Sequence, residues 1–286
     1  MSTMKLYFSY LLYNTVLNFR EKYDIIIVSN YINYNITFVQ LIRKAKKMRF
    51  SGFSDNTLKY LNDIVVMNDR KWYEEHKPDY NKYIKEPFYE LIELLTPTIR
   101  KIDPQLVTDP KKCLSRIYRD ARRVKGGCMY RDHVWLVFKR MQQDTLFENP
   151  SFYFEITPTG CSCGMGFYCA HARIMEKWRN YIADNPRAFS EAIEPIEDNP
   201  LLNAHGNSYV KPKPDCPPGL EKWYNFKTFF INTDMDISFI KSPDLAEFLA
   251  EQFEACAPLY RILSDEILNK DSDFNNMGYV FNFDID

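Results

Sequence analysis

Apolar residues recur at helical spacing along the first part of the chain beyond residue 48. Ser54 stands before an apolar series typical of a capped amphipathic helix over 54–69. A second helix is predicted over 70–80. A third opens at Pro87 and stops near residue 104, since proline fits the first turn of a helix. This third of the chain is therefore predicted to be helical.

The middle of the chain changes period. Residues 114–118, 133–138 and 152–156 are short β-branched or aromatic runs in which apolar and polar positions alternate, and Gly and Pro separate them. They predict strands of an antiparallel sheet. Residues 164–168 predict a further strand, whose two glycines allow close approach of a neighbouring backbone. Another candidate strand covers 228–232.

Helical spacing returns at residue 171, first with Ile174, Trp178 and Tyr181 and then with a shorter set ending at Ile196. A Pro/Gly/Asn-rich connection follows over 202–220. A last helix is predicted over 242–269, kinked at Pro258. Helices, then strands, then helices predict an α+β fold, in which an antiparallel sheet packs with helices in one compact domain over 48–286.

The first 47 residues differ from the rest in composition. They contain no Gly or Pro, are crowded with Asn, Tyr and Ile, and carry seven basic and two acidic residues. We expect the biological start at Met48, with 1–47 a non-native or poorly ordered extension.

Charge, cysteine content and hydropathy exclude several classes of protein. Without the first 47 residues, the chain has 30 basic and 36 acidic residues, which argues against sequence-independent nucleic-acid binding. Seven cysteines without a convincing secretory signal indicate reduced thiols and a cytoplasmic location. No uninterrupted apolar run is long enough for a membrane span, so no membrane partner is expected. The oligomeric state stays open.

The strongest candidate chemistry is an arginine-rich segment, 116–131. Guanidinium groups bind planar oxyanions in a bidentate manner and a lysine adds a point charge, so the segment suits a small ligand that carries phosphate or carboxylate. Asp120, beside so many cations, is a better orienter than proton shuttle. The alternative is that these arginines pair with surrounding carboxylates on a solvated face. The candidate ligand-binding residues are Arg116, Tyr118, Arg119, Asp120, Arg122, Lys125 and Arg131, with Trp72 as an aromatic wall.

Two other groups are weighed against structural roles. Cys161, Cys163, Cys169 and His171 are zinc-type residues, but the gap of one residue between the first two is shorter than structural zinc sites use, so free thiols are favoured and no metal or cofactor is predicted. Trp72 and Tyr73 can wall a pocket, although aromatic residues at helical spacing are more often buried in a core.

The order of these landmarks resembles a widespread bacterial and fungal family of conserved hypothetical proteins, domain of unknown function 2461. Between 123 and 131 the chain departs from the pattern of that family, and only Lys125, Tyr130 and Arg131 match it. The resemblance implies no established activity. The motifs that carry it are Phe50-Ser51-Gly52-Phe53, Asn68-Asp69-Arg70-Lys71-Trp72-Tyr73, Lys77 to Tyr80 with Pro87, Arg116-Ile117-Tyr118-Arg119-Asp120-Ala121-Arg122, Gly164-Met165-Gly166, Trp178-Arg179 and Pro258-Leu259.

Two functions therefore remain open, and no enzymatic reaction can be named. The first is binding of, or action on, a small anionic ligand, which needs arginines converging on one place. The second is a non-catalytic protein–protein interaction module, which leaves the arginines spread and ion-paired, with an exposed apolar patch elsewhere.

Overall fold

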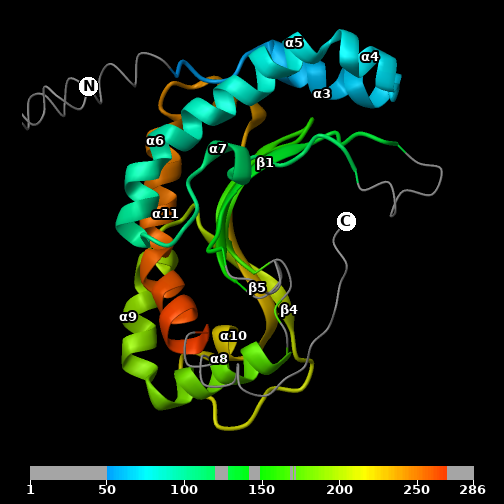
Figure 1. The fold of residues 1–286 in the computed structure, drawn as a ribbon. Coiled ribbons are helices and arrows are strands. Elements are labelled where there is room, and N and C mark those ends of the chain that lie inside the picture. The colour runs from blue at the N-terminus through cyan, green and yellow to red at the C-terminus, as the bar shows by residue number, and fades with distance from the viewer. Residues whose placement is uncertain (1–49, 120–127, 142–148, 168–169, 171, 269–286) are drawn as a thin grey trace, which may run out of the picture. The chain divides into compact units, whose positions relative to one another are not determined.

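A computed structural model describes residues 50–119, 128–141, 149–167, 170 and 172–268 (Figure 1). The predictions made for 1–47 lie outside these ranges. The described chain is a mixed α+β fold built on a five-stranded sheet, as predicted.

The helices before the sheet follow the apolar spacing of the sequence. They are α3 (Asp55–Met67), α4 (Arg70–Glu75), α5 (Lys77–Tyr80), the π-helical η1 (Asn81–Lys85) and α6 (Glu86–Ile102). Asn68 ends α3 in the left-handed conformation, and the Asp69 carboxylate caps α4 by accepting a hydrogen bond from the backbone of Trp72. All three helical predictions for this part of the chain are confirmed.

The sheet has the spatial order β1-β2-β3-β5-β4, and every pairing is antiparallel. Its strands are β1 (Val134–Phe138), β2 (Ser151–Ile156), β3 (Cys161–Gly166), β4 (Asn203–Ser208) and β5 (Phe226–Met235). The close approach predicted for the glycines is confirmed: a Cβ at Gly164 would meet the Ile231 carbonyl of β5, and one at Gly166 would meet Phe230.

One face of the sheet is buried against helices. Figure 1 shows α6 and α11 (Leu245–Arg261) running along this face. Alternate residues such as Leu136, Phe152 and Phe154 point into it and are fully buried, and the Phe152 ring lies 5.3 Å from that of Phe253 on α11. Apolar burial of this kind stabilises each large side chain by about 1.5–3 kcal/mol.

The opposite face of the sheet carries polar and aromatic side chains. Trp135, Glu155, Ser162 and Asp234 are cross-strand partners, so they form one row from β1 to β5. None of the four is buried. We call this side of the sheet the open face.

The later helices agree with the predicted periodicity. They are α8 (Ala172–Asp184), α9 (Pro186–Glu197), α11 and the π-helical η3 (Ile262–Leu268), and Pro258 lies inside α11. Three short elements were not predicted: α7 (Pro110–Cys113), α10 (Glu221–Tyr224) and the 3-10 helix η2 (Ile237–Lys241).

Two strand predictions differ from the structure. Residues 114–118 make only isolated bridges, at Leu114 and Tyr118, because the side chain of Ser115 rather than its backbone accepts from the Trp135 amide. β4 lies in a stretch that was predicted to be a connection. It was missed because its residues are polar and mostly exposed, and an edge strand needs no apolar alternation. Among the described helices, none is both long and apolar enough to span a bilayer.

Candidate functional site

The arginine-rich segment folds back on itself beside β1. Tyr118 and Tyr130 form an antiparallel bridge, the Arg119 amide donates to the Met129 carbonyl over 2.8 Å, and the Arg131 amide donates to the Ile117 carbonyl over 2.9 Å. We call the paired residues 117–119 and 129–131 the arginine hairpin. Three predicted ligand-binding residues between its arms, Asp120, Arg122 and Lys125, lie outside the described residues.

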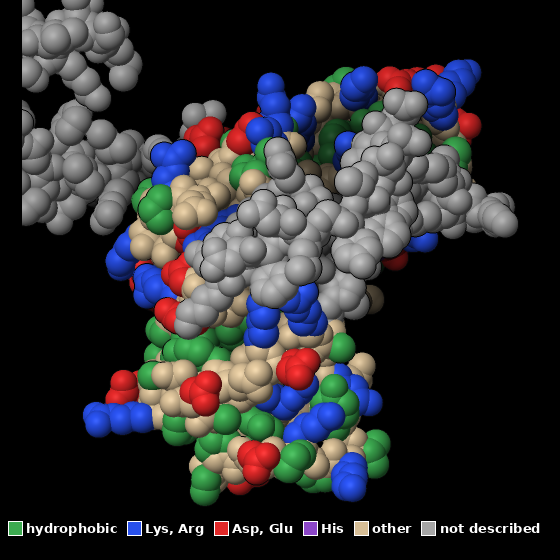
Figure 2. Space-filling model, turned by 60° about the horizontal axis from the view of Figure 1, so that its bottom comes forward, with side chains coloured by type: hydrophobic (Ala, Val, Ile, Leu, Met, Phe, Trp, Pro, Cys, Tyr) green, Lys and Arg blue, Asp and Glu red, His purple; other side chains and the backbone are tan. Residues whose placement is uncertain are grey.

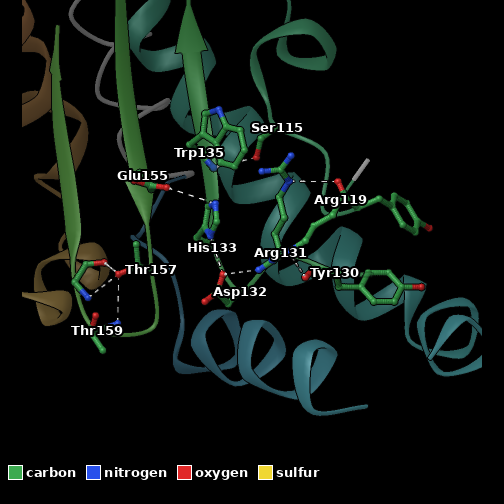
Figure 3. Close-up of polar contacts among 12 residues, drawn as sticks. Ser115, Arg119, Tyr130, Arg131, Asp132, His133, Trp135, Glu155, Thr157 and Thr159 are labelled. Atoms are coloured by element: carbon green, nitrogen blue, oxygen red, sulfur yellow. Dashed lines mark hydrogen bonds and ion pairs between the residues drawn. The ribbon is translucent and has the colours of Figure 1, made fainter. Parts of the chain in front are cut away.

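Within the arginine hairpin, two guanidinium groups are fastened reciprocally (Figure 3). Nε of Arg119 donates to the carbonyl of Tyr130 over 3.0 Å, and Nε of Arg131 donates to the carbonyl of Tyr118 over 3.3 Å. Each arginine thereby binds the arm opposite its own. The side chains are restricted in orientation, while the terminal nitrogens of both guanidinium groups remain on the outside of these bonds.

The guanidinium of Arg131 is also stacked. Its Cζ lies 4.7 Å from the ring centroid of Trp135, within the range of a cation–π contact. Trp135 belongs to the open face, and its amide is held by Ser115 Oγ over 3.0 Å. Within the described parts of the chain, no acceptor bonds to the terminal nitrogens of Arg131. A planar guanidinium whose Nε is anchored and whose two terminal nitrogens have no acceptor is suited to bind an oxyanion through two hydrogen bonds.

Arg119 and His133 share a carboxylate at the base of this site. Nη2 of Arg119 lies 3.7 Å from Oδ1 of Asp132, and Nδ1 of His133 lies 2.8 Å from the same oxygen. An ionised carboxylate only accepts hydrogen bonds, so Nδ1 carries the proton in this contact. The hydrogen bond from His133, with a smaller contribution from the charge of Arg119, lowers the pKa of the Asp132 carboxyl below its usual range.

His133 connects the arginine hairpin to the polar row of the open face. Its Nε2 lies 3.9 Å from Oε1 of Glu155, and its ring stacks on that of Trp135 at 5.3 Å (Figure 3). The imidazole therefore lies between two carboxylates, hydrogen-bonded to Asp132 and beyond hydrogen-bond distance of Glu155. No described Ser, Thr or Cys side chain hydrogen-bonds to it, so the geometry gives no nucleophile–histidine pair.

Among the described residues, the side chains of Arg116 and Tyr118 form no hydrogen bond with the guanidinium groups of Arg119 and Arg131. Arg116 is exposed, and within the described residues its side chain forms no hydrogen bond or ion pair. Tyr118 is 42% exposed, and its ring packs on Tyr73 at 5.0 Å and on Tyr130 at 5.2 Å. Burial, followed by the hydrogen bond that its hydroxyl makes with Tyr73, raises the pKa of Tyr118.

Trp72 belongs to an aromatic cluster behind the arginine hairpin. It stacks on His76 at 4.1 Å and lies 5.7 Å from Tyr60. Tyr73 is buried and Trp72 packs partly buried against the core, in keeping with the packing interpretation of this pair. Of the predicted site residues, the structure brings Arg119 and Arg131 together.

Membership of a protein family is settled by the match over most of the chain. The model of the conserved hypothetical protein family DUF2461 matches residues 56–261. The chain belongs to this family. The matched stretch of this DUF2461 protein includes the arginine hairpin, all five strands and α8 to α11. Among curated proteins, none matches the chain. The family description states no activity, so the chemistry of this DUF2461 protein has to be argued from its side chains.

Two cysteines of the candidate zinc group are buried in the core of this DUF2461 protein. Cys161 and Cys163 are free thiols and lie on the helix-covered side of β3. Burial raises the pKa of the Cys161 thiol to about 12 and raises that of Cys163 as well. Thiolates rather than thiols are the usual metal ligands, and burial works against forming the thiolate at these two positions. Cys169 and His171 lie outside the described residues, and the residues that are described contain no cluster of three metal-binding side chains.

Asp132, His133, Trp135 and Glu155 were not predicted as site residues. A signal for them was available in the alternation of 133–138, which puts His133 and Trp135 on one side of a strand. The position of Glu155 beside them depends on strand register, which the sequence does not specify by itself.

Proposed function

We propose that this DUF2461 protein binds a small anionic ligand, bearing phosphate or carboxylate, at the arginine hairpin. The observation that carries the proposal is the state of Arg131: Nε anchored on the Tyr118 carbonyl, guanidinium stacked on Trp135, and terminal nitrogens without an acceptor among the described residues. A side chain already held in one orientation loses less conformational entropy when it binds.

Neighbouring groups have distinct roles in this proposal. Arg119 supplies a second guanidinium, partly neutralised by Asp132. His133 adds a further positive charge when it is protonated. Arg122 and Lys125 are retained as additional cations and Asp120 as an orienter, on the sequence argument alone. No reaction is proposed, because the described site lacks a positioned nucleophile.

The charge distribution favours a small ligand over a nucleic acid. On the face drawn in Figure 2, coloured Lys and Arg side chains are interspersed with Asp and Glu and form no continuous basic surface. Sequence-independent nucleic-acid binding needs such a surface. We further propose a cytoplasmic location, which the free thiols of the described cysteines support.

A second candidate function is protein–protein interaction. Val66 and Met67 at the end of α3 are 79% and 55% exposed, and Met129 is 44% exposed. The backbone amide of Met129 donates to Oδ1 of Asn68 over 2.6 Å, which brings these apolar side chains to one region of the surface. Exposed apolar patches often mark partner-binding surfaces.

A ligand screen with paired arginine variants tests the first proposal. Melting temperatures of the full chain are measured with nucleotides, sugar phosphates and di- and tricarboxylates at constant ionic strength, and hits are titrated calorimetrically. We expect Arg131→Gln to abolish a selective shift that Arg116→Gln retains, because Arg116 is exposed and lies outside the arginine pair. Equal effects of the two variants, or no hit at all, would reject the anion site and favour the interaction module.

A further inference from the structure

A second group of cations surrounds Tyr209, a half-buried residue that follows β4. Nζ of Lys213 lies 4.3 Å from the centroid of the Tyr209 ring, Nζ of Lys227 lies 5.2 Å from it, and Cζ of Arg179 lies 5.4 Å from it. The three cations come from the loop after β4, from β5 and from α8. Each distance is compatible with a cation–π contact.

This arrangement is held by the backbone around Asn225. The Tyr209 amide donates to the Asn225 carbonyl over 2.9 Å, and the Lys213 amide donates to Oδ1 of Asn225 over 2.8 Å. Tyr209 and Lys213 are therefore fixed to the residue just before β5, and Lys227 is the second residue of that strand. The cations gather around the Tyr209 ring because three backbone segments meet here.

Arg179 is the member of the group that points most clearly to a missing anion. Its exposed fraction is 9%, and Nη1 is buried without a hydrogen-bond partner. Buried charges in proteins are normally paired, since desolvation of an unpaired ion is costly. Yet within the described residues no carboxylate forms an ion pair with Arg179, Lys213 or Lys227.

One acidic residue, Asp215, lies on the same loop as Lys213. Its charge raises the pKa of Tyr224, while the charge of Arg179 lowers it, so both groups lie near that hydroxyl; burial is the largest cause of the raised pKa. Asp215 makes no ion pair with a described cation. It is the group to test as a competing partner of Arg179.

We propose that Arg179, Lys213 and Lys227 form a binding site for a phosphate-type dianion beside Tyr209. Three positive charges exceed what one carboxylate neutralises, while a phosphate offers two charges and several acceptor oxygens. Since Nη1 of Arg179 is enclosed, the entering anion displaces the Tyr209 ring, whose hydroxyl bonds to no described residue. This site lies at the β4–β5 edge of the sheet and shares no residue with the arginine hairpin beside β1.

The first test measures binding of inorganic phosphate to the full chain by calorimetry at constant ionic strength, in an Arg131→Gln background that removes the other proposed site. We expect the further change Lys213→Gln/Lys227→Gln to weaken binding at least about tenfold, since each charge-assisted hydrogen bond contributes a factor of about ten or more. Asp215→Asn should leave binding equal or stronger. Absence of phosphate binding in the Arg131→Gln protein, or equal affinity with and without the two lysines, overturns the proposal.

A second test separates the binding role of Arg179 from a packing role. Arg179→Met removes the unpaired buried charge but keeps a long apolar side chain. We expect its melting temperature without phosphate to equal or exceed that of the wild type, and the phosphate-dependent increase to disappear. A lower melting temperature together with an unchanged phosphate response would assign the guanidinium to packing and reject the site. This outcome is independent of the proposed function at the arginine hairpin.

Discussion

The hydroxyl of Tyr260 donates to Oδ2 of Asp103 over 2.6 Å, joining the end of α6 to α11 in the protein interior. Nε of Arg140 donates to the same oxygen over 2.5 Å, and the backbone of Gln105 donates to Oδ1 over 2.8 Å. Nη2 of Arg140 then reaches Asp265 over 2.8 Å. Asp103 is 4% exposed, so this is a buried carboxylate whose negative charge is stabilised by three donors.

The first prediction concerns acid stability. Burial alone would raise the pKa of Asp103, but hydrogen bonds from Tyr260 and Arg140 outweigh it and leave the pKa lowered. A carboxyl with a depressed folded-state pKa contributes stability above its unfolded pKa of about 3.9, and loses it as pH falls through the folded-state pKa. We expect Asp103→Asn to cost about 3–5 kcal/mol at neutral pH, because Arg140 then loses its buried partner.

Urea midpoints measured from neutral to acidic pH check this prediction. The cost of Asp103→Asn should shrink as the pH falls from about 4, where this carboxyl takes up a proton in the unfolded chain, through the lower pKa that it has in the folded protein. The matched control is Asp265→Asn, since Asp265 contacts the same arginine but its side chain is 48% exposed. A pH-independent cost at Asp103 would contradict the ionic role.

The second prediction compares two tryptophans. Trp135→Leu removes the ring under Arg131, so the affinity for an anion that binds at the arginine hairpin should fall by about two- to tenfold, the size of a partly exposed cation–π contact. Trp72→Leu should instead lower the melting temperature and leave affinity unchanged, because Trp72 packs on Tyr60 and His76. Calorimetric titration and thermal melting of both variants check these expectations. Loss of affinity in Trp72→Leu would show that the ligand does not bind at the arginine hairpin alone.

The third prediction concerns Asn68, which has φ 43° and accepts the Met129 amide over 2.6 Å. Asn68→Ala should lower the free energy of unfolding by about 2–3 kcal/mol. The strain of a left-handed backbone at alanine contributes about 1–2 kcal/mol, and loss of the hydrogen-bond partner of the Met129 amide contributes about 1 kcal/mol. Asn68→Gly relieves the strain and should cost about 1 kcal/mol. Urea denaturation measures both. If the two variants lower the free energy of unfolding equally, the left-handed backbone conformation is not the reason for asparagine at position 68.

The fourth prediction uses a pair of glycines in and beside β3. Gly164→Ala should destabilise the protein by about 3 kcal/mol, because the new methyl group would overlap the Ile231 carbonyl and push β5 away from β3. Gly160→Ala should cost little, since its nearest neighbour would be the Met235 carbonyl oxygen at 3.9 Å. Thermal and urea denaturation check the difference, and tolerance of alanine at 164 would show that the strands can move apart cheaply.

Sequence patterns predicted the parts of the fold that depend on local spacing. The apolar series before Asn68 and the alternation in 152–156 gave a helix and a strand where the structure has them. β4 was missed because Asn203–Ser208 is an exposed polar edge strand, held by its pairing with β5 rather than by an apolar face.

The candidate site was predictable only to the extent that its residues are close in sequence. Arg119 and Arg131 belong to one charged segment, so both were predicted as site residues, whereas the pairing of the two arms that brings them together was not predicted. The position of Glu155 beside His133, and of Arg179 and Lys213 around Tyr209, depends on strand pairing and helix docking across the fold. Trp72 was grouped with the arginines on residue type, but its neighbours are aromatic residues of the helical region.

The strand order also has a consequence for the time course of folding. Cys161 of β3 pairs with Met235 of β5, and the two are separated by 74 residues, so β1, β2 and β3 are synthesised well before the strand that completes them. β4 emerges before β5 but pairs only with β5. Long-range pairing of this kind slows folding, and an unpaired strand edge promotes association between chains. During synthesis on the ribosome, the edge of β3 therefore stays unpaired until β5 has emerged. We expect nascent chains that end before residue 226 to be the species most prone to aggregate.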